Sequence, residues 1–310
     1  MTTNTGNGLL LIERVQSFLD QFMPGSKIAS IHLIEGDFTN YTHLIEVEAS
    51  HAAPQRIVLR TYNPAYGSSM SLKANIEFNT LSWLHGSAIP VAEPLHLDPD
   101  GSYLGSPGFA MHFVPGSLIM WPDNPPSNPI QYATKAAAML ASIHLFPCEP
   151  MPAFLVDGNG FVLWFLRSDK IPGYLLSHPD GPAIWNAIHN HQPDFRQSKK
   201  VLHHGDYWEG NLLWEGDEIS GVMDWEEAGY AEPGADVAYF MMGMYLIGHP
   251  EAAEAFLSRY EAIAGKKVEH LAFWELAAAV RPINHPEGWI DKPPFQERLR
   301  RFVAGALSRI

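Results

Sequence analysis

The chain has 310 residues, of which 46% are hydrophobic, so it is long enough to bury one large core or two lobes. Its formal charge of −14 argues against a nucleic-acid backbone or an anionic membrane surface as partner, because both attract Lys and Arg, whereas it suits a cationic substrate. Cys148 is the only cysteine, which excludes a disulfide within the chain and favours a reducing compartment.

The amino-terminal residues MTTNTGNG carry no charged region and no long apolar core, so we expect no signal peptide. The longest apolar run, residues 237–247, is too short to cross a bilayer. We therefore expect a cytoplasmic enzyme with no membrane and no nucleic acid among its partners, present as a monomer or a homodimer.

The first sixty residues carry the signatures of one helix and three strands. Apolar residues recur at helical spacing over 9–22, before a Pro-Gly pair that ends the helix. Three strands follow, at 31–34, 41–48 and 56–62. Side-chain alternation in the third strand places Arg60 on the same face as Val58 and Tyr62.

The next element is a helix over 71–86, which Ser71 opens and Gly86 closes. Glu77 lies in its apolar stripe, because the positions three before it and four and seven after it are Ala74, Leu81 and Leu84. A carboxylate that faces inward needs a cationic partner, and Arg60 is the candidate.

A strand at 109–113 and the Val-Pro-Gly that follows it end the amino-terminal half. Residues 121–129 are rich in Pro and Asn and are not expected to form regular structure. We place the domain boundary near Pro115, which gives an amino-terminal domain of residues 1–115 and a carboxyl-terminal domain of residues 116–310.

Most of the second half has helical periodicity. One helix is expected at 131–146. Four more are expected after residue 236, with Pro282 and Pro286 as breaks, at 237–247, 250–264, 268–280 and 294–307. His189 and His191 form an H-x-H pair of the kind that binds zinc, but they lie in the irregular stretch HNHQPDF without a nearby Cys, so we favour ordinary surface residues.

Residues 201–236 contain a hairpin signature, in which two apolar runs flank the turn Glu-Gly-Asp-Glu. If the hairpin is symmetric about its turn, Glu215 faces Ser220 and Asn211 faces Asp224. Cross-strand neighbours lie about 5 Å apart, so Asn211 and Asp224 are expected to share one divalent metal ion.

Asp206 lies five residues before Asn211, in a loop with two Gly residues that lets the chain fold back. An Asp in a loop, an Asn five residues later and an Asp after the next strand match a phosphoryl-transfer site. In such a site the first Asp accepts the proton of the attacking hydroxyl, and the Asn and the second Asp hold Mg²⁺. We therefore predict Asp206 as the catalytic residue and Asn211 and Asp224 as metal ligands.

The same stretch resembles the aminoglycoside phosphotransferase and choline kinase-like family. The motif residues that carry the resemblance are His204-Gly205-Asp206, Asn211, Asp224-Trp225-Glu226, Pro233 and Asp236. The resemblance implies an α+β, two-lobed protein-kinase-like fold, with a small antiparallel-sheet lobe plus a helix and a larger, mainly helical lobe. It also implies Mg²⁺ as cofactor, ATP or GTP as co-substrate, nucleotide binding in residues 1–115, and catalytic and acceptor sites in residues 116–310.

The resemblance further implies which residues hold the nucleotide. They are Gly36, Thr39 and Asn40 in the loop after the first strand, Arg60 and Glu77 at the phosphates, and Met111, His112 and Val114 at the adenine edge. Arg60 departs from the kinase pattern, which has Lys at this place. An Arg keeps the positive charge and binds phosphate bidentately, but its reach and shape differ from those of Lys.

The acceptor is expected to be a small hydroxylated molecule. Four acids lie near the motif residues in the sequence and favour an amine-bearing acceptor such as an aminoglycoside: Glu209, Glu226, Glu227 and Glu232. Three aromatic residues favour instead an acceptor with a hydrophobic face, such as a macrolide: Trp208, Trp225 and Tyr230. Choline, homoserine and sugars are further acceptors within the same family.

Two other functions stay open. A nucleotide-binding pseudokinase is supported only by Arg60, since Asp206, Asn211 and Asp224 are all present. A metal-dependent hydrolase that uses His203 and His204 would leave Arg60, Asn211 and Glu77 without roles.

Overall fold

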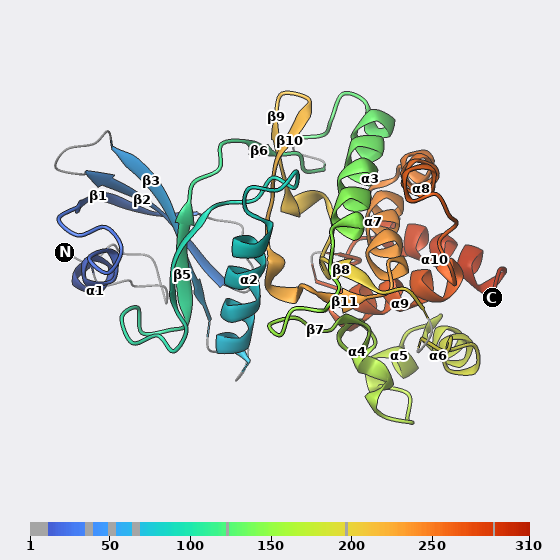
Figure 1. Cartoon of the computed structure of the whole chain (residues 1–310). Helices are drawn as coiled ribbons and strands as arrows, with labels where there is room; N and C mark the ends of the chain where they lie inside the picture. Colours follow the sequence, from blue (N-terminus) through green and yellow to red (C-terminus); the bar gives the residue numbers. More distant parts are fainter. Residues whose placement is uncertain are drawn as a thin grey trace. The chain divides into compact units, whose positions relative to one another are not determined.

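Residues 12–112 form a five-stranded antiparallel sheet with two helices in the computed structural model of the chain (Figure 1). The structure describes residues 12–34, 40–48, 54–63, 69–121, 124–195, 198–287 and 289–310. The chain divides into two compact units, one made of Met1–Pro115 and Met223–Glu226 and the other of Gly116–Val222 and Glu227–Ile310. The sequence did not indicate that residues 223–226 group with the first unit.

The first unit contains the five-stranded sheet and two helices. In chain order its elements are α1 (Ile12–Leu19), β1 (Lys27–Ile34), β2 (Asn40–Glu48), β3 (Gln55–Tyr62), α2 (Met70–Leu84), β4 (Pro94–Asp98) and β5 (Gly108–His112). The strand order in the sheet is β1-β2-β3-β5-β4, and all neighbours are antiparallel. The expected strands and helices are confirmed. Strand β4 was missed, because it is a short edge strand that begins with Pro and has no buried alternation.

The two faces of strand β3 are covered by different helices (Figure 1). Ile57 and Leu59 pack with Phe18 of α1 in one buried cluster. On the other face Arg60 lies beside Glu77 of α2. The predicted alternation of β3 is therefore confirmed, and the burial of both faces explains why all side chains from residue 57 to residue 62 are buried.

Helix α2 begins one residue before the predicted start, with Ser69 at the N-cap position. Ser71 lies inside the helix, where its hydroxyl donates to the carbonyl oxygen of Pro99 at 2.6 Å instead of capping the helix. Gly86 follows the end of the helix with a φ of +80°, a conformation that Gly adopts without strain. Glu77 is 1% exposed, which confirms that it faces inward.

The second unit is mainly helical. Its short strands and turns are β6 (Ser117–Leu118), β7 (Val156–Asp157), η2 (Trp164–Arg167), β8 (Val201–His203), η3 (Glu209–Asn211), β9 (Leu212–Glu215), β10 (Glu218–Val222) and β11 (Gly229–Ala231). Its helices are α3 (Pro129–Leu145), α4 (Gly158–Val162), α5 (Gly173–Ser177), α6 (Gly181–Asn190), α7 (Gly234–Ile247), α8 (Pro250–Ala264), α9 (Leu271–Asn284) and α10 (Pro293–Leu307). The short turn η4 (Trp225–Glu227) lies where the chain passes from the first unit back to the second.

Helix α7 is the centre of the second unit and packs against α8, α9 and α10. Its sequence is apolar on nearly every side, so it is expected to be buried within the unit. Phe240 of α7 stacks on Phe256 of α8 with ring centroids 4.1 Å apart. The expected helices of this half are confirmed.

Helix α9 differs from the prediction at both ends. It begins at Leu271 and continues to Asn284, through Pro282, which was expected to break it. A Pro removes one helical hydrogen bond and crowds the preceding turn. Pro282 lies in the last turn of α9, where little of the helix remains to be disrupted.

The hairpin of β9 and β10 has a tighter turn than the symmetric count assumed. Glu215 pairs with Glu218 and not with Ser220. The turn therefore has two residues, and Gly216 takes the positive φ of +60° that such turns require. A bulge before Gly221 then shifts the register by one more residue. The predicted pairing was wrong, so it no longer supports a position of Asn211 opposite Asp224.

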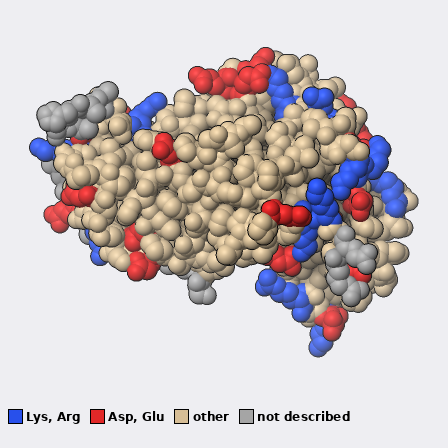
Figure 2. Space-filling model, viewed as in Figure 1, with Lys and Arg blue, Asp and Glu red and all other residues tan. Residues whose placement is uncertain are grey.

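Among the residues that the structure describes, no helix is both long and apolar enough to cross a membrane. On the face shown in Figure 2, acidic and basic side chains lie next to each other over the carboxyl-terminal helices. On α10, for example, Arg300 and Arg301 each contact Glu297. Over these carboxyl-terminal helices, the negative charge of the chain is thus not gathered into one acidic patch.

Candidate active site

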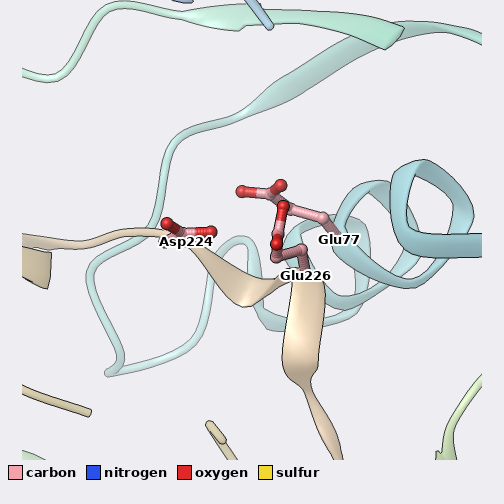
Figure 3. A group of neighbouring side chains, drawn as sticks. All are labelled: Glu77, Asp224 and Glu226. Carbon is pink, nitrogen blue, oxygen red and sulfur yellow. The ribbon is translucent and has the colours of Figure 1, made fainter. Parts of the chain in front are cut away.

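Three carboxylates surround the guanidinium group of Arg60 in the first unit. Its Nε lies 3.1 Å from Oε2 of Glu77, and its Nη2 lies 2.7 Å from Oδ1 of Asp224 and 3.3 Å from Oε2 of Glu226. Figure 3 shows Glu77 on α2 close to Asp224 and Glu226, which come from the segment after β10. The predicted contact between Arg60 and Glu77 is confirmed.

Further polar side chains complete this cluster. Asn40, at the start of β2, donates to Oε2 of Glu226 at 2.7 Å, and Lys73 of α2 contacts Oε1 of Glu226 at 2.6 Å. The hydroxyl of Tyr62 donates to Glu77. Sequence reasoning missed Lys73, although it lies four residues before Glu77 on the same helix, a spacing that places two side chains on one face.

The charges of the cluster shift the pKa values of its members. Burial raises the pKa of Glu77 above its ordinary value, although the charge of Arg60 acts to lower it. Burial would also raise the pKa of Glu226, but Arg60 and Lys73 outweigh burial, so its pKa lies below the ordinary value. For Arg60 burial acts to lower the pKa, and the charges of Asp224 and Glu77 raise it well above the ordinary value. The cluster therefore holds a permanent cation among carboxylates.

Asp224 has a backbone φ of +62°, which is unusual for a residue other than Gly. Such a conformation costs on the order of 1–3 kcal/mol and occurs often at functional sites. Ligand oxygens of Glu77, Asp224 and Glu226 all lie within 4.8 Å of one another. Hard oxygen ligands of this kind fit Mg²⁺.

In the second unit, both oxygens of the Asp206 carboxylate are engaged. The side-chain amide of Asn211 donates to Oδ2 at 3.0 Å and to the backbone oxygen of Asp206 at 2.8 Å. Arg281 donates from Nη1 to Oδ1 at 3.0 Å. The loop after β8 thus brings Asp206 and Asn211 together, as the sequence predicted. Because the amide nitrogen of Asn211 points to Asp206, its oxygen is directed elsewhere and suits a metal ligand.

Arg281, on α9, is a residue that sequence reasoning missed. It also donates to the carbonyl oxygen of Gly205 at 2.7 Å and to Oε2 of Glu227 at 2.9 Å, and its Cζ lies 4.5 Å from the ring centroid of Tyr239. Burial acts to lower its pKa, but Glu227 and Tyr239 more than offset this and raise it. The available signal was a single charge at the end of an otherwise apolar run, LAAAVR.

Asp236 stabilises the backbone of the loop that carries Asp206. Its carboxylate accepts hydrogen bonds from the backbone N–H groups of His204 at 2.8 Å and Gly205 at 2.9 Å. His144 and His203 each lie 3.1 Å from its oxygens. Burial opposes ionisation, but the neighbouring His203 and His144 hold the pKa of Asp236 well below its usual range. This buried carboxylate therefore fixes the backbone before Asp206.

Gly205 has to be Gly for two reasons. Its φ is +88°, and a Cβ at this position would lie 2.5 Å from the backbone oxygen of Glu227. The close approach of these two segments places Glu227 next to the guanidinium group of Arg281.

The remaining residues predicted to bind the nucleotide are Gly36, Thr39, Met111, His112 and Val114. Gly36 and Thr39 lie outside the described residues. Met111 and His112 are the last residues of β5, where they pair with Val58 and Ile57 of β3, and Val114 follows two residues later. Their role at an adenine edge stays a prediction.

His189 lies in the last turn of α6 and His191 is the C-cap of this helix, so the expectation that the pair lies in an irregular stretch was wrong. His189 stacks on Trp185 with ring centroids 5.7 Å apart, and Nδ1 of His191 lies 2.9 Å from the carbonyl oxygen of Ala187. Both His side chains are exposed and make only these local contacts in the described part of the chain, as expected for ordinary surface residues.

The model of the phosphotransferase enzyme family matches residues 30–274 of the chain. Acyl-CoA dehydrogenase family member 10 of Mus musculus is 28% identical over 184 residues, which are 55% of this chain and 17% of that protein. The chain thus spans less than a fifth of this relative. The 4-hydroxytryptamine kinase of Psilocybe cyanescens is 21% identical over 241 residues, with 69% of this chain and 67% of that protein covered.

Among solved structures, the ternary complex of the aminoglycoside phosphotransferase APH(2")-IIa with streptomycin and ATP superposes with a TM-score of 0.62 at 15% identity, with 97% of this chain and 99% of that one covered. At this identity the likeness shows the fold. The predicted fold class, with an antiparallel-sheet part and a mainly helical part as in protein kinases, is confirmed.

Proposed function

The chain belongs to the phosphotransferase enzyme family, and from this premise we propose that it transfers the γ-phosphoryl group of ATP or GTP to a hydroxyl group of a small molecule. The reaction requires Mg²⁺. From the strong negative charge of the chain, the sequence predicts an amine-bearing acceptor such as an aminoglycoside, which is one candidate for this reaction. A macrolide, choline, homoserine or a sugar is the alternative within the same chemistry.

One observation carries this proposal: the contact of Arg60 with Glu77 and Asp224. A cation on the third strand, a Glu on the following helix and an Asp far along the chain are the parts that kinases combine to hold nucleotide phosphates. Here they come from three separate segments and meet within hydrogen-bonding distance. Exposed surface ion pairs contribute little, whereas Arg60 and Glu77 are buried and Asp224 is half-buried.

Asp206 is the residue that we assign to the acceptor hydroxyl. In the transfer, the bond between the γ-phosphorus and the bridging oxygen breaks, a new bond forms to the acceptor oxygen, the hydroxyl proton passes to Asp206, and the nucleoside diphosphate leaves. Asn211 and Arg281 hold the two oxygens of Asp206 in place during this step. The nucleotide phosphates are assigned to Arg60.

Mg²⁺, when bound, neutralises charge on the phosphate oxygens. The oxygens of Asn211 and Asp224 are the ligands that we propose, and Glu77 and Glu226 offer further oxygens next to Asp224. A cytoplasmic location and a monomeric or homodimeric state remain predictions from the sequence.

A metal-dependent hydrolase is disfavoured by the surroundings of its two His residues. His203 and His204 are 1% and 0% exposed. The ring of His203 lies beside Asp236, and Nδ1 of His204 accepts from the backbone N–H of Asp206. Neither ring is placed to bind a metal ion at an open site.

The experiment that tests the proposed function is a screen for ATP and GTP consumption with amino-sugars, amino-alcohols, macrolides and neutral sugars as acceptors. With an active acceptor, Asp206→Asn is expected to lower turnover by about 10²–10⁴, because this is what a positioned base contributes, while nucleotide affinity is kept. Near-normal turnover of Asp206→Asn would remove Asp206 from this role.

A further inference from the structure

The acids that favoured an amine-bearing acceptor are mostly engaged elsewhere. Glu226 belongs to the cluster around Arg60 and is held by Lys73. Glu209 is buried, and its Oε2 would lie 3.2 Å from a Cβ at Gly243 of α7. Glu232 is also buried, and burial raises its pKa. Of the four acids, the one found beside Asp206 is Glu227.

The charges beside Asp206 nearly cancel. Arg281 contacts both Asp206 and Glu227, so two carboxylates and one guanidinium leave a formal charge of −1. An acceptor that depends on several positive charges finds little to bind in this cluster.

Three aromatic rings lie next to the same cluster, and we call them the aromatic wall: Trp208, Tyr239 and Trp289. The ring centroids of Trp208 and Trp289 are 6.2 Å apart and those of Tyr239 and Trp289 are 6.0 Å apart. Tyr239 is buried under Arg281, whereas Trp208 and Trp289 are half-buried and keep part of their surface accessible. Trp208 is two residues from Asp206 in the chain.

The observed orientation of Trp208 requires Gly at position 210. A Cβ at Gly210 would lie 2.5 Å from Cη2 and 2.8 Å from Cε2 of the Trp208 ring. The indole therefore lies directly on the backbone of Gly210, and any larger residue there would displace it. The Gly210 backbone on one side and the ring of Trp289 restrict the indole, and a restricted ring loses little conformational entropy when a ligand stacks on it.

We propose that Trp208 and Trp289 form a stacking surface for the acceptor, and that the acceptor is an alcohol that carries a flat aromatic ring. This inference rests on the proposed function, because it names the substrate class of the same site. The ring packs on the wall, and the hydroxyl on its side chain reaches Asp206. An amine on such an acceptor is compatible with the residual negative charge, but the ring carries the recognition. Aromatic rings prefer flat partners at offset-stacked or edge-to-face geometry, which an aliphatic ring does not reproduce.

The test is a direct binding measurement, which does not depend on turnover. The matched probes are 2-(2-naphthyl)ethanol and its saturated analogue 2-(decahydronaphthyl)ethanol, with kanamycin as an amine-bearing probe without an aromatic ring. Binding is measured by ligand-observed NMR and calorimetry in the presence of Mg²⁺ and a non-hydrolysable ATP analogue, on the full chain. We expect the naphthyl alcohol to bind about 2- to 10-fold more tightly than the saturated alcohol, since this is what a favourable aromatic pair is worth in affinity.

The variants locate this binding on the wall. Trp208→Ala and Trp289→Ala are each expected to weaken binding of the naphthyl alcohol by about 2- to 10-fold, and Phe in place of Trp at position 289 (Trp289→Phe) is expected to retain part of this affinity. The control is Trp121→Ala, which removes another half-buried Trp of the second unit, one that contacts Tyr132 and His249 instead. Thermal unfolding of each variant shows that it is folded.

Two results would overturn the inference and leave the kinase proposal intact. One is equal affinity for the naphthyl and saturated alcohols, or binding of kanamycin alone. The other is a loss of affinity for the naphthyl alcohol in Trp121→Ala as large as in Trp208→Ala and Trp289→Ala. A chain that binds no nucleotide at all, measured separately by thermal shift, would contradict the proposed function and the inference together.

Discussion

Arg281 donates a hydrogen bond to Asp206, although the two residues are 75 positions apart in the chain. The same guanidinium group bridges to Glu227, so it is held from both sides. This geometry makes Arg281 the residue that orients the proposed base.

Arg281→Ala is expected to lower kcat by about 10²-fold, because a misplacement of a reacting group by about 1 Å costs this much. The KM for the nucleotide should stay within about twofold. Added guanidinium chloride at low millimolar concentration should restore part of the activity of Arg281→Ala, which a purely structural defect would not allow. Arg301→Ala on the surface of α10 is the control, and an unchanged kcat in Arg281→Ala would refute the orienting role.

Arg60 and Glu77 should be energetically coupled. Residues in contact within one charged network show interaction energies of about 0.5–3 kcal/mol in double-mutant cycles. The cycle uses Arg60→Gln and Glu77→Gln, with unfolding by urea as the measurement. Arg56 lies on the same strand but stacks on Phe113, so the cycle of Arg56→Gln with Glu77→Gln should be additive. Additivity in both cycles would show that the contact between Arg60 and Glu77 contributes nothing to stability.

Asp224→Ala should abolish the thermal stabilisation that Mg²⁺ and nucleotide together produce. Its carboxylate is the proposed metal ligand and also holds Arg60 at 2.7 Å. A ligand present at 100 times its Kd raises the free energy of unfolding by about 2.7 kcal/mol, which gives a measurable shift in Tm. The control is Asp217→Ala, an exposed acid in the nearby turn. If the shift persists unchanged in Asp224→Ala, this residue is not a metal ligand.

Cys148 should react slowly with thiol reagents. Burial, with a smaller contribution from the charge of Glu149, raises the pKa of its thiol to about 11. The thiolate is the reactive form, so less of it is present at pH 8 than for an ordinary thiol with a pKa of about 8.5. We expect the native chain to react with a disulfide reagent at least about 10² times more slowly than the urea-unfolded chain. The rate should keep rising with pH toward 11, and a plateau near pH 8.5 would contradict the shift.

The sequence predicted contacts that depend on the local repeat of an element. The inward position of Glu77 follows from helical periodicity, and the face of Arg60 follows from strand alternation, so their meeting could be anticipated. Asp206 and Asn211 also lie on one short loop. In each of these cases a few neighbouring residues contain the information.

Contacts that depend on turn geometry or on distant segments could not be predicted in the same way. The hairpin register changed because the turn at Gly216 is two residues long and a bulge follows, and neither is visible as a pattern of apolar residues. Arg281 reaches Asp206 only through the packing of α9 in the second unit. Pro282 was expected to stop this helix, but a Pro in the last turn has few hydrogen bonds to remove.

The grouping of residues 223–226 with the first unit has a consequence for synthesis on the ribosome. Residues 1–115 emerge first, yet Asp224 and Glu226, which surround Arg60, come much later, and Glu226 follows 111 residues after Pro115 (226 − 115). At about 5–20 residues per second this is a delay of roughly 6–20 s. During that interval the nascent first unit holds Arg60 and Glu77 without two of their charged neighbours. Its final stability is reached only after more than half of the second unit has been translated, so the two units are expected to mature together and not one after the other.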